Sequence, residues 1–366
     1  MDQITIDHAR LLKTFLELVR IDSYHGHENR IVEVIRPKLD ALGLATKIDA
    51  TGNLIARWPA DGIDANALML NAHMDTVRPT PGLEPIVTDE GVASDGSSVL
   101  GADDKAGIAA IIEGVQSVAD AGLPHRMIEL VFTVGEDVGH VGSRAFDAAD
   151  IEARIGLVFD GDGPVGSVVT RGPAAIGFKA VFCGAAAHAG IEPEQGVSSI
   201  AMMARAIDQM DLGRVDNDTV ANIGTVAGGQ AMNIVPPETT IVGQARSRSD
   251  DRLKEQIRRM REAMEHAADE FGGSVEYEET IGIHAYVLAD LSSIVKLGDL
   301  AIRRSGLEPS HVATRGGSDA HEFNSKGIWS AILGLGCTGA HTAKEFAPHK
   351  AMRQLALIAA HAIAVE

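Results

Sequence analysis

The chain has 366 residues, which is long for a single hydrophobic core and suits two domains. Hydrophobic residues make up 45% of it and charged residues 23%, and no charge-free apolar stretch approaches the roughly 18 residues of a membrane span. The formal net charge of −19 disfavours nucleic acid and anionic membranes as partners, because both bind clustered Lys and Arg. The first residues lack the basic and apolar regions of a secretory signal, so we expect a soluble, cytoplasmic protein.

The first half of the chain alternates between helical and strand-like patterns. Apolar periodicity predicts helices near residues 6–20, 28–42 and 104–120, and strands near 53–58, 67–71, 127–134 and 155–159. The continuous apolar character of the last strand is typical of a strand that is covered on both faces. We therefore expect an α/β domain with a mixed, largely parallel sheet and helices on both faces.

Beyond Thr170 the pattern changes. Strands are predicted near 174–183, 220–226, 239–246 and 274–281, with helices near 197–210 and between Ser249 as N-cap and Gly272 as stop. This βαββαβ order is that of the ferredoxin-like, split βαβ sandwich. The last segment returns to helix, strand and helix and suits completion of the first domain. We expect one domain from residues 1–171 and 284–366, interrupted by an inserted domain at 172–283.

Acidic and histidine side chains follow the predicted strands of the first domain. They are His73 and Asp75 after 67–71, Glu136 and Asp137 at the end of 127–134, and Asp160 after 155–159. Open α/β sheets place ligands at the carboxyl ends of their strands, so these groups should meet at one edge. Each motif alone has an ordinary interpretation as surface or capping residues. Three strands that deliver such groups to one edge favour a functional site.

Metal binding is the chemistry that these residue types favour. Asp103 and Asp104 open the predicted helix at 104–120, where one carboxylate would suffice as a cap. A second carboxylate beside it adds repulsion that a cation would relieve. The two cysteines, Cys183 and Cys337, have no Cys-x-x-Cys spacing, which argues against a disulfide framework and a thiolate zinc site. Any metal must therefore use histidine and carboxylate ligands.

One competing motif is excluded. Residues 161–166 match the dinucleotide-binding pattern G-x-G-x-x-G after a strand. Pro164 and the strand-like residues 167–170 do not open a helix, so a pyrophosphate would have no helix N-terminus to bind.

Taken in order, these motifs resemble the peptidase T, glutamate carboxypeptidase and acetylornithine deacetylase family of co-catalytic zinc hydrolases. The resemblance rests on His73-Met-Asp75-Thr-Val, Gly-Ala-Asp103-Asp-Lys, the acidic pair at 136 and 137, Asp160, and His341-Thr-Ala-Lys-Glu345-Phe. It covers essentially the whole chain, and the motifs are specific as a set although none is specific alone.

The resemblance implies two divalent metal ions per chain. We expect Zn²⁺, and Co²⁺ or Mn²⁺ are the alternatives. His73 and Asp160 would bind one ion, Asp137 and His341 the other, and Asp103 would bridge both. The peptide bond between Asp103 and Asp104 would be cis. The usual family pair at positions 136 and 137 is Glu-Glu, whereas here the second member is Asp, one methylene shorter.

The same resemblance assigns two further roles near the ions. Glu136 would be the general base, and Asp75 would orient the ring of His73. This division of labour agrees with the chemistry of amide hydrolysis, which needs a strong nucleophile near pH 7. A zinc-bound water has its pKa lowered to about 7. Glu136 could take its proton and pass it to the leaving amine.

The inserted domain would supply substrate contacts. By the resemblance, His188 donates a hydrogen bond to the oxyanion, and Asn233 and Arg246 contact the carboxylate or backbone of the substrate. Arg248, two residues on, competes with Arg246 for that role. Without the resemblance, His188 is an ordinary exposed or core histidine.

One further loop resembles the family's substrate-side loop. It contains Ser318 and Asp319 and follows two glycines, so its ordinary interpretation is a glycine-rich turn.

We therefore expect a metal-dependent hydrolase of short peptides, resembling the tripeptide aminopeptidase peptidase T. A carboxypeptidase or N-acyl-amino-acid deacylase with the same metal centre is the enzyme alternative. A metal-binding interaction protein that has lost catalysis is the alternative of a different class, although retention of Glu136 argues against it. The edge strand of the inserted domain must be covered, which favours a homodimer through that domain.

Overall fold

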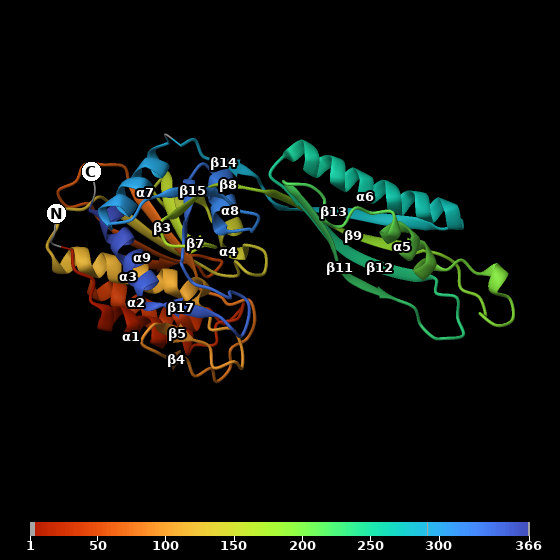
Figure 1. Ribbon diagram of the computed structural model, residues 1–366, viewed down its shortest axis with the longest axis horizontal. Helices are drawn as coiled ribbons and strands as arrows, with labels where there is room; N and C mark the ends of the chain where they lie inside the picture. The colour runs from red at the N-terminus through yellow and green to blue at the C-terminus, as the bar shows by residue number, and fades with distance from the viewer. Residues whose placement is uncertain (1–3, 291, 365–366) are drawn as a thin grey trace. The chain divides into compact units, whose positions relative to one another are not determined.

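The computed structural model describes residues 4–290 and 292–364. Its contacts divide the chain into two compact units (Figure 1). Unit 1 contains the chain up to Arg171, Val287–Thr314 and the residues from Ser318 onward, and unit 2 contains Gly172–Tyr286 and Arg315–Gly317. In the described part of the chain, no helix is long and apolar enough to cross a membrane.

Unit 1 is built on a nine-stranded sheet whose longest path runs β1-β2-β6-β3-β7-β16-β8-β14, with β15 paired to β8. The strands are β1 (Ala45–Ile48), β2 (Leu54–Trp58), β3 (Leu68–His73), β6 (Ile128–Thr133), β7 (Ile155–Gly161), β8 (Ser167–Gly172), β14 (Tyr286–Val287), β15 (Ser310–Ala313) and β16 (Trp329–Gly334). The central strands β6, β3, β7 and β16 are parallel, whereas β1, β2 and β8 run antiparallel to a neighbour. The predicted mixed, largely parallel sheet is confirmed. Every residue of β3 and β6 is buried, as the continuous apolar pattern of these strands requires.

Seven helices of unit 1 lie within the described residues. They are α1 (His8–Val19), α2 (Asn29–Ala41), α3 (Ala102–Asp120), α4 (Val141–Ala145), α7 (Ser293–Arg304), α8 (Asp319–Ser325) and α9 (His349–Ile363). Helix α3 packs against β3, β7, α1 and α9, while α7 packs against β7 and β16. The close approach of α3 to α9 depends on Gly114, because a Cβ atom there would lie 2.7 Å from the Cβ of Ala359.

The sequence patterns did not predict several short elements of unit 1. These are α4, α8, the 3₁₀ helix at Ala148–Asp150 and a small sheet of β4 (Ile86–Val87), β5 (Gly91–Ala93) and β17 (Phe346–Pro348). Each has seven residues or fewer, which is too short for an apolar period to develop.

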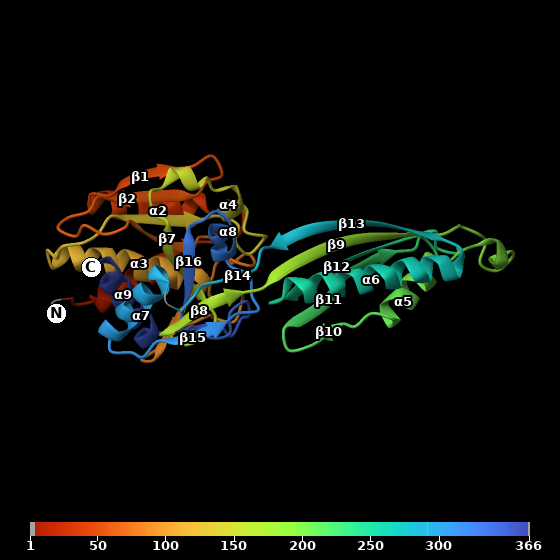
Figure 2. The same ribbon diagram turned by 90° about the horizontal axis from the view of Figure 1, so that it is seen from above.

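Unit 2 has the predicted ferredoxin-like order. Its elements are β9 (Ala174–Cys183), a 3₁₀ helix at Pro193–Gln195, α5 (Ser199–Asp208), β10 (Gly213–Arg214), β11 (Thr219–Gly228), β12 (Glu238–Ser247), α6 (Asp250–Phe271) and β13 (Ser274–Ile283). The sheet runs β10-β11-β12-β9-β13 and is antiparallel, with α5 and α6 on one face (Figure 2). Ser249 caps α6 by accepting the N–H of Arg252, and Gly272 ends it in the left-handed conformation, as the sequence predicted.

Candidate metal centre

Parallel neighbours in the sheet of unit 1 bring the predicted ligands to one edge. His73 is the last residue of β3, and Asp160 is the last residue but one of β7, which pairs with β3 in parallel. Glu136 and Asp137 follow β6, the other parallel neighbour of β3. The loop after β6 therefore begins beside His73, since His73 pairs with the last residue of β6. Open α/β sheets form sites in this way at the carboxyl ends of their strands.

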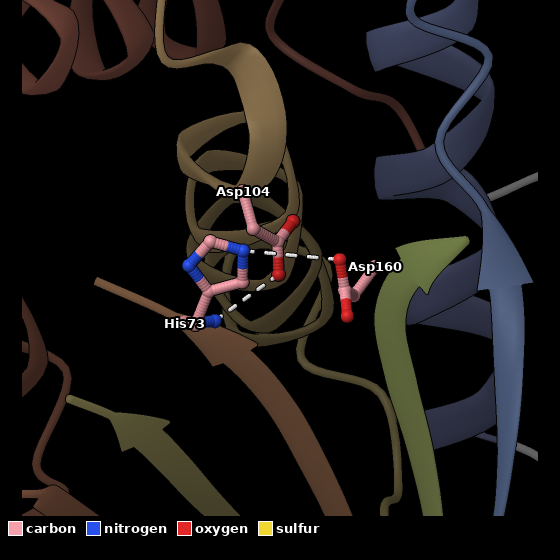
Figure 3. Close-up of side chains that lie close together, drawn as sticks. All are labelled: His73, Asp104 and Asp160. Atoms are coloured by element: carbon pink, nitrogen blue, oxygen red, sulfur yellow. Dashed lines mark hydrogen bonds and ion pairs between the residues drawn. The ribbon is translucent and has the colours of Figure 1, made fainter. Parts of the chain in front are cut away.

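His73 faces carboxylates from α3 and β7. Its Nε2 atom lies 3.2 Å from Oδ1 of Asp103 and 3.8 Å from Oδ1 of Asp160. The side chain of His73 is only 1% exposed. In Figure 3 the ring of His73 at the end of β3 points toward Asp160, with Asp104 at the start of α3 beside them.

Asp103 also faces a second histidine with its other oxygen. Oδ2 of Asp103 lies 3.2 Å from Nε2 of His341, which lies the same distance from Oδ1 of Asp137. One carboxylate thus stands between two histidines, which is the arrangement that a bridging ligand needs. The side chain of His341 is 52% exposed, whereas those of His73 and Asp137 are buried. The peptide bond between Asp103 and Asp104 is cis, as predicted.

The distances fit ligands around cations. Bonds of about 2.0–2.1 Å from a tetrahedral zinc ion to nitrogen and oxygen place its ligand atoms about 3.3 Å apart. The pairs of Asp103 with both histidines, and of Asp137 with His341, lie at 3.2 Å. Oδ2 of Asp137 is also buried and has no hydrogen-bond partner among the described residues. A buried carboxylate oxygen without a partner is costly, and a cation would satisfy it.

Two overlapping groups each have ligand atoms within 4.8 Å of one another: His73, Asp104 and Asp160, and His73, Asp75 and Asp137. Asp104 thus lies within reach of the candidate ligands, although the sequence analysis named only Asp103 as a ligand. We interpret Asp104 as support for His73, because its Oδ2 accepts the backbone N–H of His73 at 3.1 Å. Its Oδ1 lies only 2.2 Å from where a Cβ on Gly107 would stand, so the carboxylate packs against α3.

The electrostatics of the group also favour added positive charge. Hydrogen bonding to Asp103, followed by that to Asp137, raises the pKa of His341 to about 10. Burial, and then the neighbouring carboxylates of Glu136 and Asp103, raise the pKa of Asp160 well above its ordinary value. Buried carboxylates that resist ionisation beside one another are stabilised by cations.

Asp75 ties His73 to the acidic loop. Its Oδ1 lies 3.3 Å from Nδ1 of His73, on the ring edge opposite the candidate ion. The two oxygens of Asp75 also accept the backbone N–H groups of Glu136 at 2.9 Å and Asp137 at 3.1 Å. Asp75 is therefore placed to orient the imidazole of His73 and the loop that delivers the proposed base.

Glu136 is enclosed beside the candidate ligands. Burial raises its pKa above the ordinary carboxyl value. Its Oε1 lies 3.2 Å from Nε2 of His140, a residue that the sequence analysis did not single out. His140 has a positive φ of 59°, which turns the chain back toward Glu136. Sequence spacing offers no signal for a turn of this kind.

Glu345 is another residue whose role the sequence did not reveal. It is 1% exposed, and its oxygens accept the backbone N–H groups of Gly101 at 2.8 Å and Asp103 at 2.9 Å. Lys105, on the same α3 segment, is fully buried and donates to the carbonyl of Ile21 at 2.8 Å. Burial lowers the pKa of Lys105 to about 7. Glu345 thus holds the backbone at Gly101 and Asp103, and Lys105 connects α3 to Ile21.

Unit 2 contains the other predicted substrate residues. His188 and Asn233 lie in neighbouring segments, because the N–H of Ala189 donates to the carbonyl of Asn233 at 3.0 Å. Arg246 lies near the far end of β12 and contacts Gln244 and the carbonyl of Arg315. Its competitor Arg248 is engaged by Asp218 at 2.6 Å. Within unit 2 the structure brings His188 and Asn233 together and separates both from Arg246.

Ser318 and Asp319 do not form a simple turn. Ser318 is the N-cap of α8, and Asp319 is 1% exposed. The carboxylate of Asp319 accepts hydrogen bonds from the hydroxyl groups of Thr133 and Ser143. Asp319 therefore links β6 to α4 in this structure. A contact of Ser318 or Asp319 with substrate stays a prediction.

Comparison with known proteins gives one family and several relatives. Residues 69–365 match the peptidase family M20/M25/M40. The chain is 38% identical to the Bacillus subtilis protein YqjE, whose function is uncharacterised, over 94% of both chains. A crystal structure of a tripeptidase from Staphylococcus aureus has a TM-score of 0.93 and 38% identity, with 98% of each chain covered. A crystal structure of the aminopeptidase PepT from Bacillus cereus has a TM-score of 0.89 and 36% identity, again with 98% of each chain covered.

Proposed function

We propose, on the premise that the chain belongs to the peptidase family M20/M25/M40, that it is a two-metal aminopeptidase of short peptides. Its family makes it a metal-dependent peptide-bond hydrolase. The observation that supports two ions is the carboxylate of Asp103, which presents one oxygen to His73 and the other to His341.

The proposed ligand sets follow from these contacts. His73 and Asp160 would hold one ion, Asp137 and His341 the other, and Asp103 would be shared. Both sets consist of imidazole and carboxylate groups, for which Zn²⁺ is the first choice and Co²⁺ and Mn²⁺ are alternatives. When bound, the ions polarise the scissile carbonyl and lower the pKa of the attacking water.

Glu136 is the group that we assign to proton transfer. It is enclosed beside the ligands, and burial raises its pKa, which makes its carboxylate a stronger base than an exposed one. The N–H groups of Glu136 and Asp137 are fixed on Asp75, so the base and a metal ligand are positioned together. Glu136 takes a proton from the attacking water and gives it to the leaving amine, which must depart protonated.

The residues of unit 2 support a dimer as the active form. Arg246 and Glu238 are separated along β12 by eight residue steps of about 3.4 Å, or roughly 27 Å. His188 lies beyond the Glu238 end, since it pairs with Ile234, which precedes β12. An extended tripeptide spans only about 10 Å. If His188 and Arg246 both contact one substrate, they must therefore come from different subunits.

The choice of an aminopeptidase is supported by the two solved structures that cover 98% of this chain, which are an aminopeptidase and a tripeptidase. The test is product analysis by mass spectrometry after incubation of the metal-loaded protein with a free tripeptide, its N-acetyl form and an N-acetyl amino acid. We expect release of the amino-terminal residue from the free tripeptide only. Release of the carboxyl-terminal residue would indicate a carboxypeptidase, and cleavage of the acetyl group a deacylase.

A further inference from the structure

Glu345 joins two parts of the metal centre that are far apart in sequence. Its side chain accepts the N–H groups of Gly101 and Asp103, which are 244 and 242 residues away along the chain. Its own N–H donates to the carbonyl of Thr342, the residue after His341. One side chain therefore connects the loop that contains His341 with the backbone of Asp103.

The geometry of this contact favours a carboxylate over an amide. Each oxygen of Glu345 accepts one backbone N–H group, and a carboxylate offers acceptors on both oxygens. Charge-assisted hydrogen bonds of this kind are about twice as strong as neutral ones. An amide at this position would turn its NH₂ group toward one of the two N–H donors, and a buried donor would lose its partner.

We propose that Glu345 is a positioning residue for the second ion, the one that Asp137 and His341 would share with Asp103. This inference rests on the proposed function, since it assumes that the group binds two ions. We assign Glu345 no ligand role, since its oxygens are directed at the backbone N–H groups of Gly101 and Asp103.

The second ion depends on Glu345 more than the first because its ligands lie outside the sheet. His73 and Asp160 belong to adjacent strands, and the N–H of His73 is also held by Asp104. His341 lies in the connection between β16 and β17, with a positive φ of 64° and a half-exposed side chain. Strand pairing fixes His73 and Asp160. His341 has no such support, so loop contacts such as those of Glu345 must make its position rigid.

The test is a titration of metal-free Glu345→Gln with Co²⁺, followed by isothermal calorimetry and visible absorption. We expect the second ion to bind about 10 to 100-fold more weakly, as is usual when a partner of a ligand is lost. The first ion should weaken less, because it shares Asp103 but keeps His73 and Asp160 on paired strands. The absorption of the second ion should also change, because the directions of its ligands are altered. Neither readout depends on turnover.

Two further variants separate positioning from general stability. Glu113→Gln is the matched control, since Glu113 is a buried carboxylate of unit 1 that accepts the N–H of Asp7 away from the candidate ligands. It should lower the unfolding temperature and leave both Co²⁺ affinities unchanged. Glu345→Asp keeps the charge but is too short to reach both N–H groups, and it too should weaken the second ion.

The outcomes distinguish this inference from the proposed function. If wild-type protein binds two ions and both Glu345 variants bind the second as tightly as wild type does, the positioning role is wrong while the two-metal centre stands. Equal weakening of both ions in the two variants also contradicts it. If wild-type protein binds only one ion, the two-metal function itself is wrong.

Discussion

The carboxylate of Asp75 accepts the backbone N–H of Glu136 at 2.9 Å. This contact joins the residue that we propose to orient His73 to the residue that we propose as the general base. Glu136 lies beyond the last residue of β6, where Asp75 adds its two N–H contacts to the backbone hydrogen bonds of the loop. Asp75 therefore couples the position of the His73 ring to that of Glu136.

Asp75→Asn should lower both metal affinity and kcat by about 10 to 100-fold, because its amide would face two N–H donors and weaken its hold on His73. Metal analysis after dialysis and steady-state kinetics would measure the two effects. Asp216→Asn is a matched control, since Asp216 accepts two backbone N–H groups in unit 2, from Asp218 and Thr219. Wild-type activity in Asp75→Asn would reduce Asp75 to a capping residue.

Glu136→Gln should lower kcat by about 100 to 10,000-fold and leave the metal content unchanged, if Glu136 acts on a proton rather than on an ion as we propose. Elemental analysis alongside tripeptide kinetics provides the comparison. If the variant instead loses metal together with activity, Glu136 is a ligand and the division of roles between Glu136 and Asp137 is wrong.

Gly107→Ala should destabilise the protein by about 1–3 kcal/mol, because the new Cβ overpacks a closed site. It would lie 2.2 Å from Oδ1 of Asp104 and 2.5 Å from the carbonyl oxygen of Phe159. Gly298→Ala is the counterpart in α7, where the nearest atom to a Cβ is Cδ2 of Leu157 at 3.6 Å. It should stabilise by about 0.4–1 kcal/mol, since Ala is the better helix former. Urea denaturation of both variants tests the opposite signs.

The elements that could be predicted from the sequence are those whose apolar pattern extends over many residues. The long period of α6 and the continuous apolar runs of β3 and β6 determine structure locally, so their type and approximate bounds could be predicted. The helix predicted at 104–120 begins at Ala102, and its first turn contains non-helical backbone at Asp103 and Asp104. Such local turns decide where a helix begins, and an apolar period does not reveal them.

For the candidate site, the sequence predicted the ligands but not all of the residues that support them. His73, Asp103, Asp137, Asp160 and His341 were named from motifs, and the fold brings them together. The contacts of Glu345 with Asp103 and of Glu136 with His140 depend on chain reversals that have no sequence period. The separation of His188 from Arg246 follows from the length of β12 and from the pairing of His188 with Ile234, a tertiary contact that no motif indicates.

His188→Ala should lower turnover by about 100 to 1,000-fold with both ions retained, if its imidazole donates a hydrogen bond to the oxyanion. Because His188 and Arg246 are far apart within unit 2, we also expect His188 to act in the site of the other subunit. Mixed dimers of His188→Ala and the inactive Glu136→Gln should regain activity, because one of the two sites then combines an intact base with an intact histidine from the other subunit. Verified mixed dimers without any regained activity would place His188 in the site of its own subunit.

The central claim is that two ions held by this ligand set drive peptide hydrolysis. The most direct measurement is the rate of hydrolysis of a free tripeptide by exhaustively chelated protein while Zn²⁺ is added back in known amounts. We expect no hydrolysis by the metal-free protein and a rate that reaches its plateau at about two ions per chain. Hydrolysis that survives complete removal of metal, or a full rate at a single ion per chain, would contradict the account.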